Sequence, residues 1–193
     1  MDVATLITTL AEAVPGARLD DGQGLDQPAL VVSGGHLPEV CRVLRDRPDL
    51  HFDVLADVTA VDWWPREPRY EVVYHLLSTA RPARLRVGVA LDGADAHVGT
   101  VREIWAAAGW LEREVWDLFG VVFDGNGDLR RLLMPEDWEG HPLRKDYPVQ
   151  ITMKPRVYAP LQVTEEEFHA QIEKDRHVRG GTGLERPKVE GKG

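Results

Sequence analysis

The chain has 193 residues, of which 43% are hydrophobic, and a formal net charge of −9 at pH 7. That hydrophobic fraction is enough for a folded core and excludes a wholly disordered chain. The acidic charge argues against nucleic-acid binding, which needs clustered Lys and Arg. No apolar run approaches the roughly 18 residues of a membrane span. The opening MDVATLITTLAEAVPG lacks the basic start of a signal peptide. We therefore expect a soluble, cytosolic chain.

Two helices and a short strand are predicted in the first 50 residues. The first helix covers roughly residues 2–14 and ends at Pro15-Gly16. A strand at 29–33 is followed by a second helix of about ten residues, with Pro38 in its first turn. The only cysteine, Cys41, lies on that helix among apolar residues. One thiolate cannot form an intrachain disulfide or ligate an iron–sulfur cluster alone, so a buried structural thiol is predicted.

Three strand-like segments follow, joined by short connections. Period-two alternation over 51–64, 69–79 and 83–92 predicts an antiparallel meander with one wet face. The side chains expected on the covered face are Phe52, Val54, Ala56, Val58, Tyr70, Val72, Tyr74, Leu76, Leu85, Val87, Val89 and Leu91. Helices before and after the meander should cover that face, which predicts an α+β fold.

Helical patterning returns at Thr100, the expected N-cap of a helix that Gly109 interrupts. The stretch WLEREVWDLFG then places Leu111, Val115, Leu118 and Phe119 on one stripe and ends at Gly120, a favoured C′ residue. Arg113 and Asp117 are four residues apart and are expected to pair on the exposed side.

From residue 121 the periodicity stops, although large aromatic residues remain. The sequence predicts three parts: a core domain at 1–120, an irregular arm at 121–163, and a short helix with a flexible tail at 164–193. Thr164 and Glu167 form a capping box, and Phe168 with Ile172 gives that helix only a thin apolar edge. Residues 177–193 are expected to be disordered without a partner.

No cofactor or metal motif is convincing. Gly125-Asn126-Gly127 lacks the third glycine of a dinucleotide site and the Lys-Ser/Thr of a phosphate loop, so we interpret it as a turn. A calcium loop fails because Leu129 and Pro135 stand where glycine and glutamate are required. The seven histidines show no zinc-ligand spacing. No metal site is predicted.

The segment MPEDWEGHPLRKDYP, residues 134–148, contains four acids, a histidine and two basic residues. Carboxylate catalysis with His141 as a base is one interpretation. Alternatively, Pro135 and the acids after it form the first turn of a short helix that Gly140 ends. Stiff X-Pro dipeptides and aromatic residues favour binding instead. The pattern leaves open whether the segment binds a partner or packs on its own domain.

These residues carry a resemblance to a known family. The chain resembles the C subunit of proton-translocating NADH-quinone oxidoreductase, respiratory complex I, in the run Glu112-Arg113-Glu114-Val-Trp-Asp117-Leu-Phe-Gly120 and in PEDWEGHPLRKDYP. The similarity extends over about residues 3–160. One departure is that Gly125-Asn126-Gly127 stands where the family has Gly-His-Pro, which puts any role of that histidine in doubt.

The resemblance implies a non-catalytic scaffold subunit of the peripheral arm, on the cytoplasmic side of the cell membrane. It implies no cofactor in this chain, with FMN and iron–sulfur clusters in partner subunits, and docking against the D subunit, which shapes the quinone site. The partner-binding side chains it implies are Glu112, Arg113, Glu114, Asp117, Arg130, Arg131, Glu136, Asp137, His141, Arg144, Lys145, Asp146 and Tyr147. The tail beyond Tyr158 would extend over neighbouring subunits.

Two alternatives remain at this point. The chain could be the equivalent subunit of a related complex that oxidises reduced deazaflavin or hydrogen. It could also be an independent hydrolase that uses the acid-rich segment, in which case the purified chain would turn over substrate.

Overall fold

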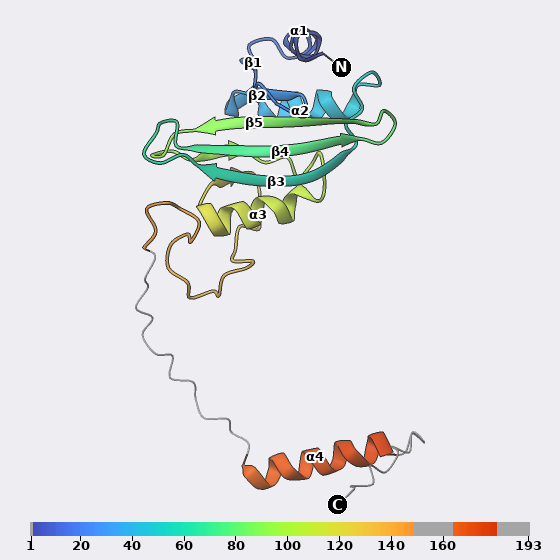
Figure 1. The fold of residues 1–193 in the computed structure, drawn as a ribbon, viewed down its shortest axis with the longest axis vertical. Helices are drawn as coiled ribbons and strands as arrows, with labels where there is room; N and C mark the ends of the chain where they lie inside the picture. The colour runs from blue at the N-terminus through green and yellow to red at the C-terminus, as the bar shows by residue number, and fades with distance from the viewer. Residues whose placement is uncertain (1, 149–163, 181–193) are drawn as a thin grey trace, which may run out of the picture. The chain divides into compact units, whose positions relative to one another are not determined.

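The structure of the chain, a computed structural model, describes residues 2–148 and 164–180 and consists of two compact units (Figure 1). Residues 1–149 form the first unit and residues 150–193 the second. The elements of the first unit are α1 (Val3–Ala13), β1 (Leu19–Asp21), β2 (Ala29–Val32), a 3-10 turn η1 (Gly34–His36), α2 (Leu37–Asp46), β3 (Val54–Asp62), β4 (Tyr70–Ser78), β5 (Ala83–Leu91), β6 (His97–Gly99), α3 (Ala108–Phe119) and β7 (Val122–Asp124).

A five-stranded sheet with the order β1-β2-β5-β4-β3 is the centre of this unit. The predicted meander of β3, β4 and β5 is confirmed, since each neighbouring pair is antiparallel. Strand β2 joins the other side of β5 in parallel, so the sheet is mixed. The sequence could not specify this pairing because it depends on a long crossover connection rather than on a local turn.

The alternation of β4 and β5 is confirmed, because all eight side chains expected on their covered face are buried. In β3 the prediction is wrong near the start of the strand. The register shifts between Leu55 and Asp57, so that Leu55 is buried and Ala56 is exposed. Such a bulge inserts one residue and reverses which face the preceding side chains occupy.

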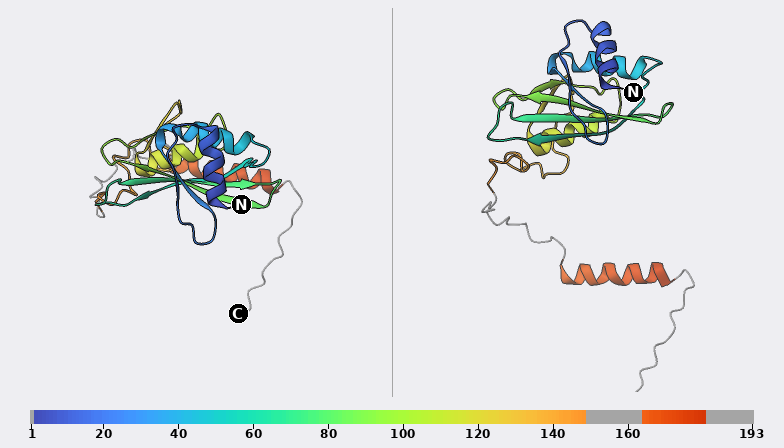
Figure 2. Two further views of the ribbon diagram at one scale, coloured as in Figure 1. Left: turned by 90° about the horizontal axis from the view of Figure 1, so that it is seen from above. Right: turned by 45° about the horizontal axis from the view of Figure 1, so that its top comes forward.

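Helices α2 and α3 lie on the same face of the sheet, and α1 covers its β1–β2 edge (Figures 1 and 2). Their apolar stripes join the covered face in one core, to which Cys41 contributes a completely buried thiol, as predicted. Burial raises the pKa of this thiol, and the nearby Glu112 carboxylate raises it further. The core fixes the position of α3 beneath β3, where the candidate site is built.

The predicted helix after Thr100 is absent. Residues 100–107 form turns, α3 begins at Ala108, and Gly109 lies inside α3 rather than breaking it. The predicted end at Gly120 is confirmed, since Gly120 has the left-handed φ of 76° and its N–H donates to the Trp116 carbonyl. The sequence did not predict the short strands β6 and β7. Strand β6 precedes α3 in the chain and β7 follows it, and the two strands pair in parallel.

Beyond β7 the first unit continues to residue 149, although a boundary was expected near residue 120. Residues 127–148, which we call the strap, contain no helix or strand and lie beside α3 (Figure 1). The helix considered possible at Pro135 is a single turn in which the Trp138 N–H donates to the Pro135 carbonyl.

In the second unit, α4 (Glu165–Gly180) confirms the predicted helix. Its capping box is present, because the Glu167 N–H donates to the Thr164 hydroxyl and the Thr164 N–H to the Glu167 carboxylate. Residues 177–180, expected to be disordered, belong to this helix, and the rest of the predicted tail and Tyr158 lie outside the described residues. Within the described ranges, no helix is long and apolar enough to span a membrane.

Candidate functional site

Three of the four charged residues of α3, all except Glu114, point into the protein rather than to solvent. Glu112 and Asp117 have no exposed surface, and Arg113 is 7% exposed. The predicted pair between Arg113 and Asp117 on an exposed side is therefore wrong. Leu111 and Leu118, expected in the buried stripe, are only partly buried. Apolar periodicity failed here because polar side chains with complete sets of partners occupy the covered face of the helix.

Glu112 collects three hydrogen bonds from two other segments. The Val101 N–H donates to its carboxylate over 2.8 Å and the Asn126 Nδ2 over 2.9 Å, and the Thr100 hydroxyl donates as well. Burial raises the pKa of Glu112, while these hydrogen bonds oppose the rise.

Asn126 connects this buried carboxylate to the surface. Its Oδ1 accepts hydrogen bonds from the Arg102 guanidinium and from the Asp128 N–H, each at 3.2 Å. The amide is thereby oriented with its Nδ2 toward Glu112. Gly125, with a φ of 90°, makes the preceding turn, as interpreted from the sequence. The Asn126 amide therefore supplies Glu112 with a donor that does not titrate.

Asp117 organises the beginning of the strap. Its Oδ2 accepts from three successive backbone amides, those of Leu132, Leu133 and Met134, at 2.8–2.9 Å. Its Oδ1 lies 2.9 Å from the Arg131 guanidinium. Burial favours the neutral acid, but these donors outweigh it and lower the pKa of Asp117. Three consecutive N–H groups around one carboxylate are a backbone anion nest, here occupied by a side chain of the same protein.

The carbonyl groups at the C-terminal end of α3 are capped by the strap. His141 Nδ1 lies 2.9 Å from the Asp117 carbonyl, and the Leu143 N–H donates to the Leu118 carbonyl over 3.0 Å. Arg144 Nε donates to the Phe119 carbonyl. A helix leaves its last carbonyls without partners, and cations are favoured near this end of the helix dipole. Because a carbonyl only accepts, His141 must carry its proton on Nδ1.

His141 is therefore a capping residue in this structure. Burial lowers its pKa, and the guanidinium groups of Arg144 and Arg131 lower it further. Its ring also contacts Trp116 edge to face, with centroids 6.0 Å apart. A neutral histidine already engaged with a backbone carbonyl is poorly placed to act as a general base, which weakens the hydrolase interpretation.

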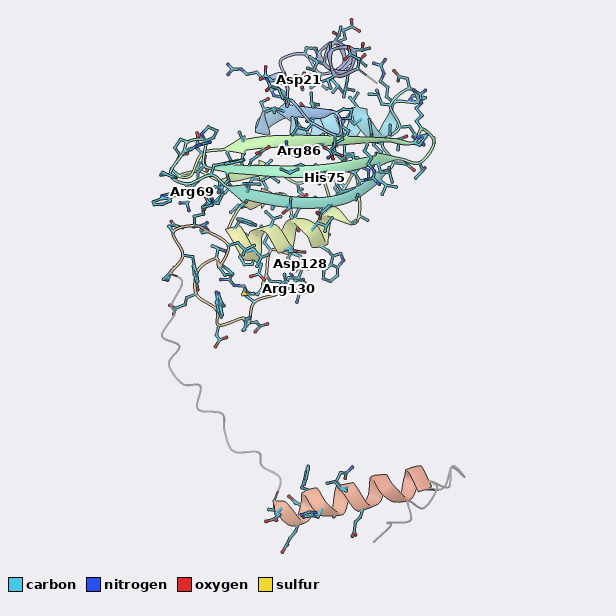
Figure 3. The ribbon with its side chains drawn as sticks, viewed as in Figure 1. Asp21, Arg69, His75, Arg86, Asp128 and Arg130 are labelled. Carbon is cyan, nitrogen blue, oxygen red and sulfur yellow. The ribbon has the colours of Figure 1, made fainter. Side chains whose placement is uncertain are left out.

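Arg113 and Arg131 tie further backbone to α3. Arg113 donates to the carbonyl groups of Arg130 and Arg131 at 2.7 and 2.6 Å. Arg131 donates to the carbonyl groups of Trp138 and Gly140, each at 2.8 Å. Arg130 itself is exposed and pairs with Asp128, and both lie beside α3 in Figure 3. Arg131 therefore binds backbone of the strap, whereas its neighbour Arg130 faces solvent.

A second buried carboxylate, Asp62 at the end of β3, holds the far part of the strap. It accepts from Arg69 at 2.8 Å and from the Lys145 N–H at 2.8 Å, and Arg69 also forms a bidentate pair with Asp146. Burial raises the pKa of Asp62, but the hydrogen bonds from Arg69, Lys145 and Trp64 dominate and lower it to about 2. Figure 3 shows Arg69 at the end of the sheet where the strap approaches.

The remaining predicted residues lie toward the outside. Glu136, Asp137, Lys145 and Asp146 are exposed, and Glu114 is partly exposed. Tyr147 stacks on Trp138 with centroids 6.5 Å apart, and its hydroxyl donates to the Glu139 carbonyl. Most of the thirteen predicted residues thus either hold the strap in shape or form its outer surface. Glu112 binds residues 100, 101 and 126 instead, and Glu114 lies on α3.

Four residues of this network were missed in the sequence: Asp62, Arg69, Thr100 and Asn126. Asp62 and Arg69 are far from the strap in sequence, and nothing local marks their contact with it. Asn126 was interpreted only as part of a turn, because its side-chain contact with Glu112 spans 14 residues of sequence. Within residues 2–148 and 164–180, no three His, Cys, Asp or Glu side chains come together as metal ligands would.

Comparisons with known proteins show which family the sequence matches. Residues 30–152 match the family described as the 30 kDa subunit of respiratory-chain NADH dehydrogenase. The chain is 42% identical over 149 residues to the C subunit of NADH-quinone oxidoreductase from Roseiflexus sp., covering 77% of this chain and 86% of that protein. It is 47% identical over 140 residues to the C subunit from Saccharopolyspora erythraea, covering 72% of this chain and 55% of that protein.

Two solved structures are also similar. A trypsin-resistant fragment (1-134) of Nqo5 superposes with a TM-score of 0.53 at 31% identity, covering 66% of this chain and 100% of the fragment. A chain of the membrane-bound sulfane sulfur reductase, an archaeal respiratory membrane complex, superposes with a TM-score of 0.63 at 26% identity, covering 84% of this chain and 95% of that chain.

Proposed function

This chain belongs to the family of the 30 kDa subunit, or C subunit, of NADH-quinone oxidoreductase, and we propose that within such a complex it is a scaffold subunit that carries out no redox step. One observation supports this role above all. The chemically capable side chains of 112–146 are used to fix backbone, with Asp117, Arg131, His141 and Arg144 all bound to the strap or to the end of α3. A segment built in this way supplies a shaped surface rather than a reactive group.

The outer side of the strap is the docking surface of this proposal. Its exposed side chains include Leu133 and Leu143, which are 55% and 50% exposed, and the acids Glu136 and Glu139. Exposed leucines next to charged groups are typical of a surface that another protein covers. The proposed partner is the D subunit, which shapes the quinone site, with basic side chains facing Glu136 and Glu139.

In the assembled complex, FMN and iron–sulfur clusters belong to partner subunits, and the isolated chain is inactive. This chain then lies on the cytoplasmic side of the cell membrane, attached through its partners, and supports electron transfer from NADH to quinone coupled to proton translocation. The single cysteine supports the assignment of clusters elsewhere, because its buried thiol has a raised pKa and thiolate is the ligand that a cluster requires.

Isolation of membranes in mild detergent tests the proposal. We expect this chain to co-purify with an assembly that contains iron–sulfur clusters and reduces quinone with NADH. A chain recovered only as a free monomer from a cell that contains such an assembly would contradict it. Reduction of quinone by the purified chain alone would contradict the scaffold role.

A second candidate keeps the scaffold role and changes the complex. The similarity to a chain of the sulfane sulfur reductase favours it, because that respiratory complex is not named for NADH. The donor would then be reduced deazaflavin or hydrogen. The donor specificity of the co-purified assembly separates the two candidates, since this chain would dock through the same surface in both.

A further inference from the structure

The strap, residues 127–148, is attached to the rest of its unit mainly through polar contacts, although Leu129 packs against the core as a partly buried side chain. None of its residues is fully buried, whereas the core of the same unit is a continuous cluster of buried apolar side chains. Two of its leucines, Leu133 and Leu143, are about half exposed. Burial of apolar surface is the main stabilising contribution in folding. The strap therefore has much less of the contribution that makes the core stable.

Polar contacts at two carboxylates and one helix end hold the strap instead. The Asp117 carboxylate accepts hydrogen bonds from three backbone amides of the strap and from the Arg131 side chain. The Asp62 carboxylate accepts a hydrogen bond from the Lys145 N–H. The C-terminal carbonyls of α3 accept from His141, Leu143 and Arg144. In each case the acceptor belongs to α3 or β3, which are outside the strap. Water can replace such donors, so each bond adds only about 1 kcal/mol net.

We propose that the strap opens and closes as one local unit while the sheet and its helices stay folded, with Asp117 and Asp62 as its two anchors. Segments with few apolar contacts and a surface-exposed backbone open in this way at a lower free energy than the core. The closed state is the main state of the free protein, because the anchors are deeply buried, fully ionised and supplied with several donors each.

Closure has a consequence for assembly that rests on the proposed function. The outer surface with Leu133, Leu143, Glu136 and Glu139 has a defined shape only while the strap is closed. A partner that binds this surface binds the closed form and shifts the population toward it. Asp117 is then a positioning residue: it has no exposed surface for a partner to touch, and it acts through the segment it holds.

Hydrogen exchange in the purified full-length chain, resolved by residue, tests the opening. The probes are the amides of Leu132, Leu133 and Met134, and the references are Val72 and Tyr74 in β4. We expect the strap amides to exchange at least about 100-fold faster than the references, yet at least about 10-fold slower than an unprotected peptide. Rates equal to those of β4 would overturn the proposal, because the strap would then open only with the core. Unprotected rates would overturn it because no closed state would be populated.

Asp117→Asn and Asp128→Asn form a matched pair for the anchor. Both make the same chemical change, but Asp128 is exposed and pairs with Arg130 and, at the longer distance of 3.6 Å, with Arg113. Asp117→Asn is expected to speed exchange of the strap amides by about 10-fold or more without changing β4, whose amides also report whether the variant is folded. Asp128→Asn keeps the contacts of Arg113 with the Arg130 and Arg131 carbonyls and should speed these rates far less. Equal effects of the two variants, or faster exchange in β4 as well, would overturn the assignment of Asp117 as a local anchor.

The same measurement in the purified assembly tests the link to docking. If hydrogen exchange of the strap amides is at least about 10-fold slower in the assembly than in the free chain, the partner captures the closed form. An unchanged rate would overturn capture, although co-purification itself, and with it the scaffold role, would stand. Failure to co-purify would contradict the proposed function, whereas the exchange of the free chain would still decide whether the strap opens.

Discussion

The carboxylate of Asp117 lies 2.9 Å from the guanidinium of Arg131, and the Asp117 side chain has no exposed surface. This pair joins the end of α3 to the start of the strap across 14 residues of sequence. It also explains why an acid and a pair of arginines accompany each other in this chain. One of the two arginines neutralises a buried charge, and its neighbour faces solvent.

Arg131→Gln is expected to release the strap, and Arg130→Gln is its control. Loss of the Arg131 cation leaves a buried carboxylate that only backbone amides compensate, a change that typically costs about 3–5 kcal/mol. Because the strap can open locally, the free energy of global unfolding should fall by no more than the closing energy of the strap. Denaturant unfolding and hydrogen exchange together check this. A fall of the same size in Arg130→Gln would contradict the distinction.

Acid should loosen the strap before it unfolds the core. The pKa of Asp62 is lowered to about 2, and that of Asp117 is also lowered. A depressed carboxyl pKa adds stability above the unfolded value of about 3.9, and this stability is lost as the pH falls toward the folded value. For Asp62 the loss is about 2 kcal/mol between pH 4 and pH 2. Exchange of the strap amides, corrected for the intrinsic pH dependence, should therefore accelerate below pH 4 while β4 stays protected. Protection that is constant down to pH 2 would contradict this.

Gly120→Ala should be destabilising, whereas Gly109→Ala should not. Gly120 has a φ of 76°, and a Cβ there would overlap the side chains of Arg144 and His141. The left-handed conformation alone costs a non-glycine residue about 1–2 kcal/mol, and displacement of the two capping side chains adds to this. A Cβ at Gly109 meets nothing within 4 Å, so alanine there gains up to about 1 kcal/mol of helix propensity. Thermal unfolding of both variants measures the difference, and equal midpoints would contradict it.

Glu112→Ala should be among the most destabilising substitutions of a charged residue in this chain. It leaves the Val101 N–H, the Thr100 hydroxyl and the Asn126 amide without their acceptor in a buried site. Each such group costs about 1–3 kcal/mol. Glu103→Ala removes an exposed carboxylate and should change stability by less than about 0.5 kcal/mol. Denaturant unfolding compares them.

The pKa of Glu112 adds a dependence on pH of the opposite sign. Because burial raises it, the protonated acid is favoured in the folded state. The stability that this preference contributes is complete below the unfolded pKa and is lost as the pH rises through the folded value. The Glu112→Ala variant should therefore lose less stability than wild type when the pH rises across this range. A parallel pH dependence in the two proteins would contradict the assignment.

Arg144→Ala should lower the amount of assembled complex without changing its affinity for quinone. Arg144 caps α3 and holds the strap, so its loss lowers the population of the surface proposed for docking. Lys145→Ala, which keeps the backbone contact with Asp62, is the matched control. Native gels give the amount of complex, and the quinone KM of the complex that does form should equal that of wild type. A raised KM with a normal amount of complex would contradict a scaffold role.

The sequence predicted the elements whose contacts are local. The alternation of β4 and β5, the end of α3 at Gly120 and the capping box of α4 were all predicted correctly, because each depends on residues within a few positions of one another. The bulge between Leu55 and Asp57 escaped prediction because no residue type in this segment marks where the register shifts. The contacts of the Thr100 hydroxyl and the Val101 N–H with Glu112 escaped prediction because these residues are eleven or twelve positions apart in the sequence.

By itself, then, the sequence determined the fold class, the family and the segment in which the unusual residues gather. It could not decide whether that segment packs on its own domain or extends away from it, since balanced charges are compatible with both. Only the tertiary structure decided this, by bringing Asp117 and Asp62, which are 55 positions apart in sequence, to opposite ends of one strap. Hydrogen-bond donors of the strap reach these carboxylates only because the folded sheet and α3 hold Asp62 and Asp117 beside it. Sequence periodicity does not predict such long-range contacts.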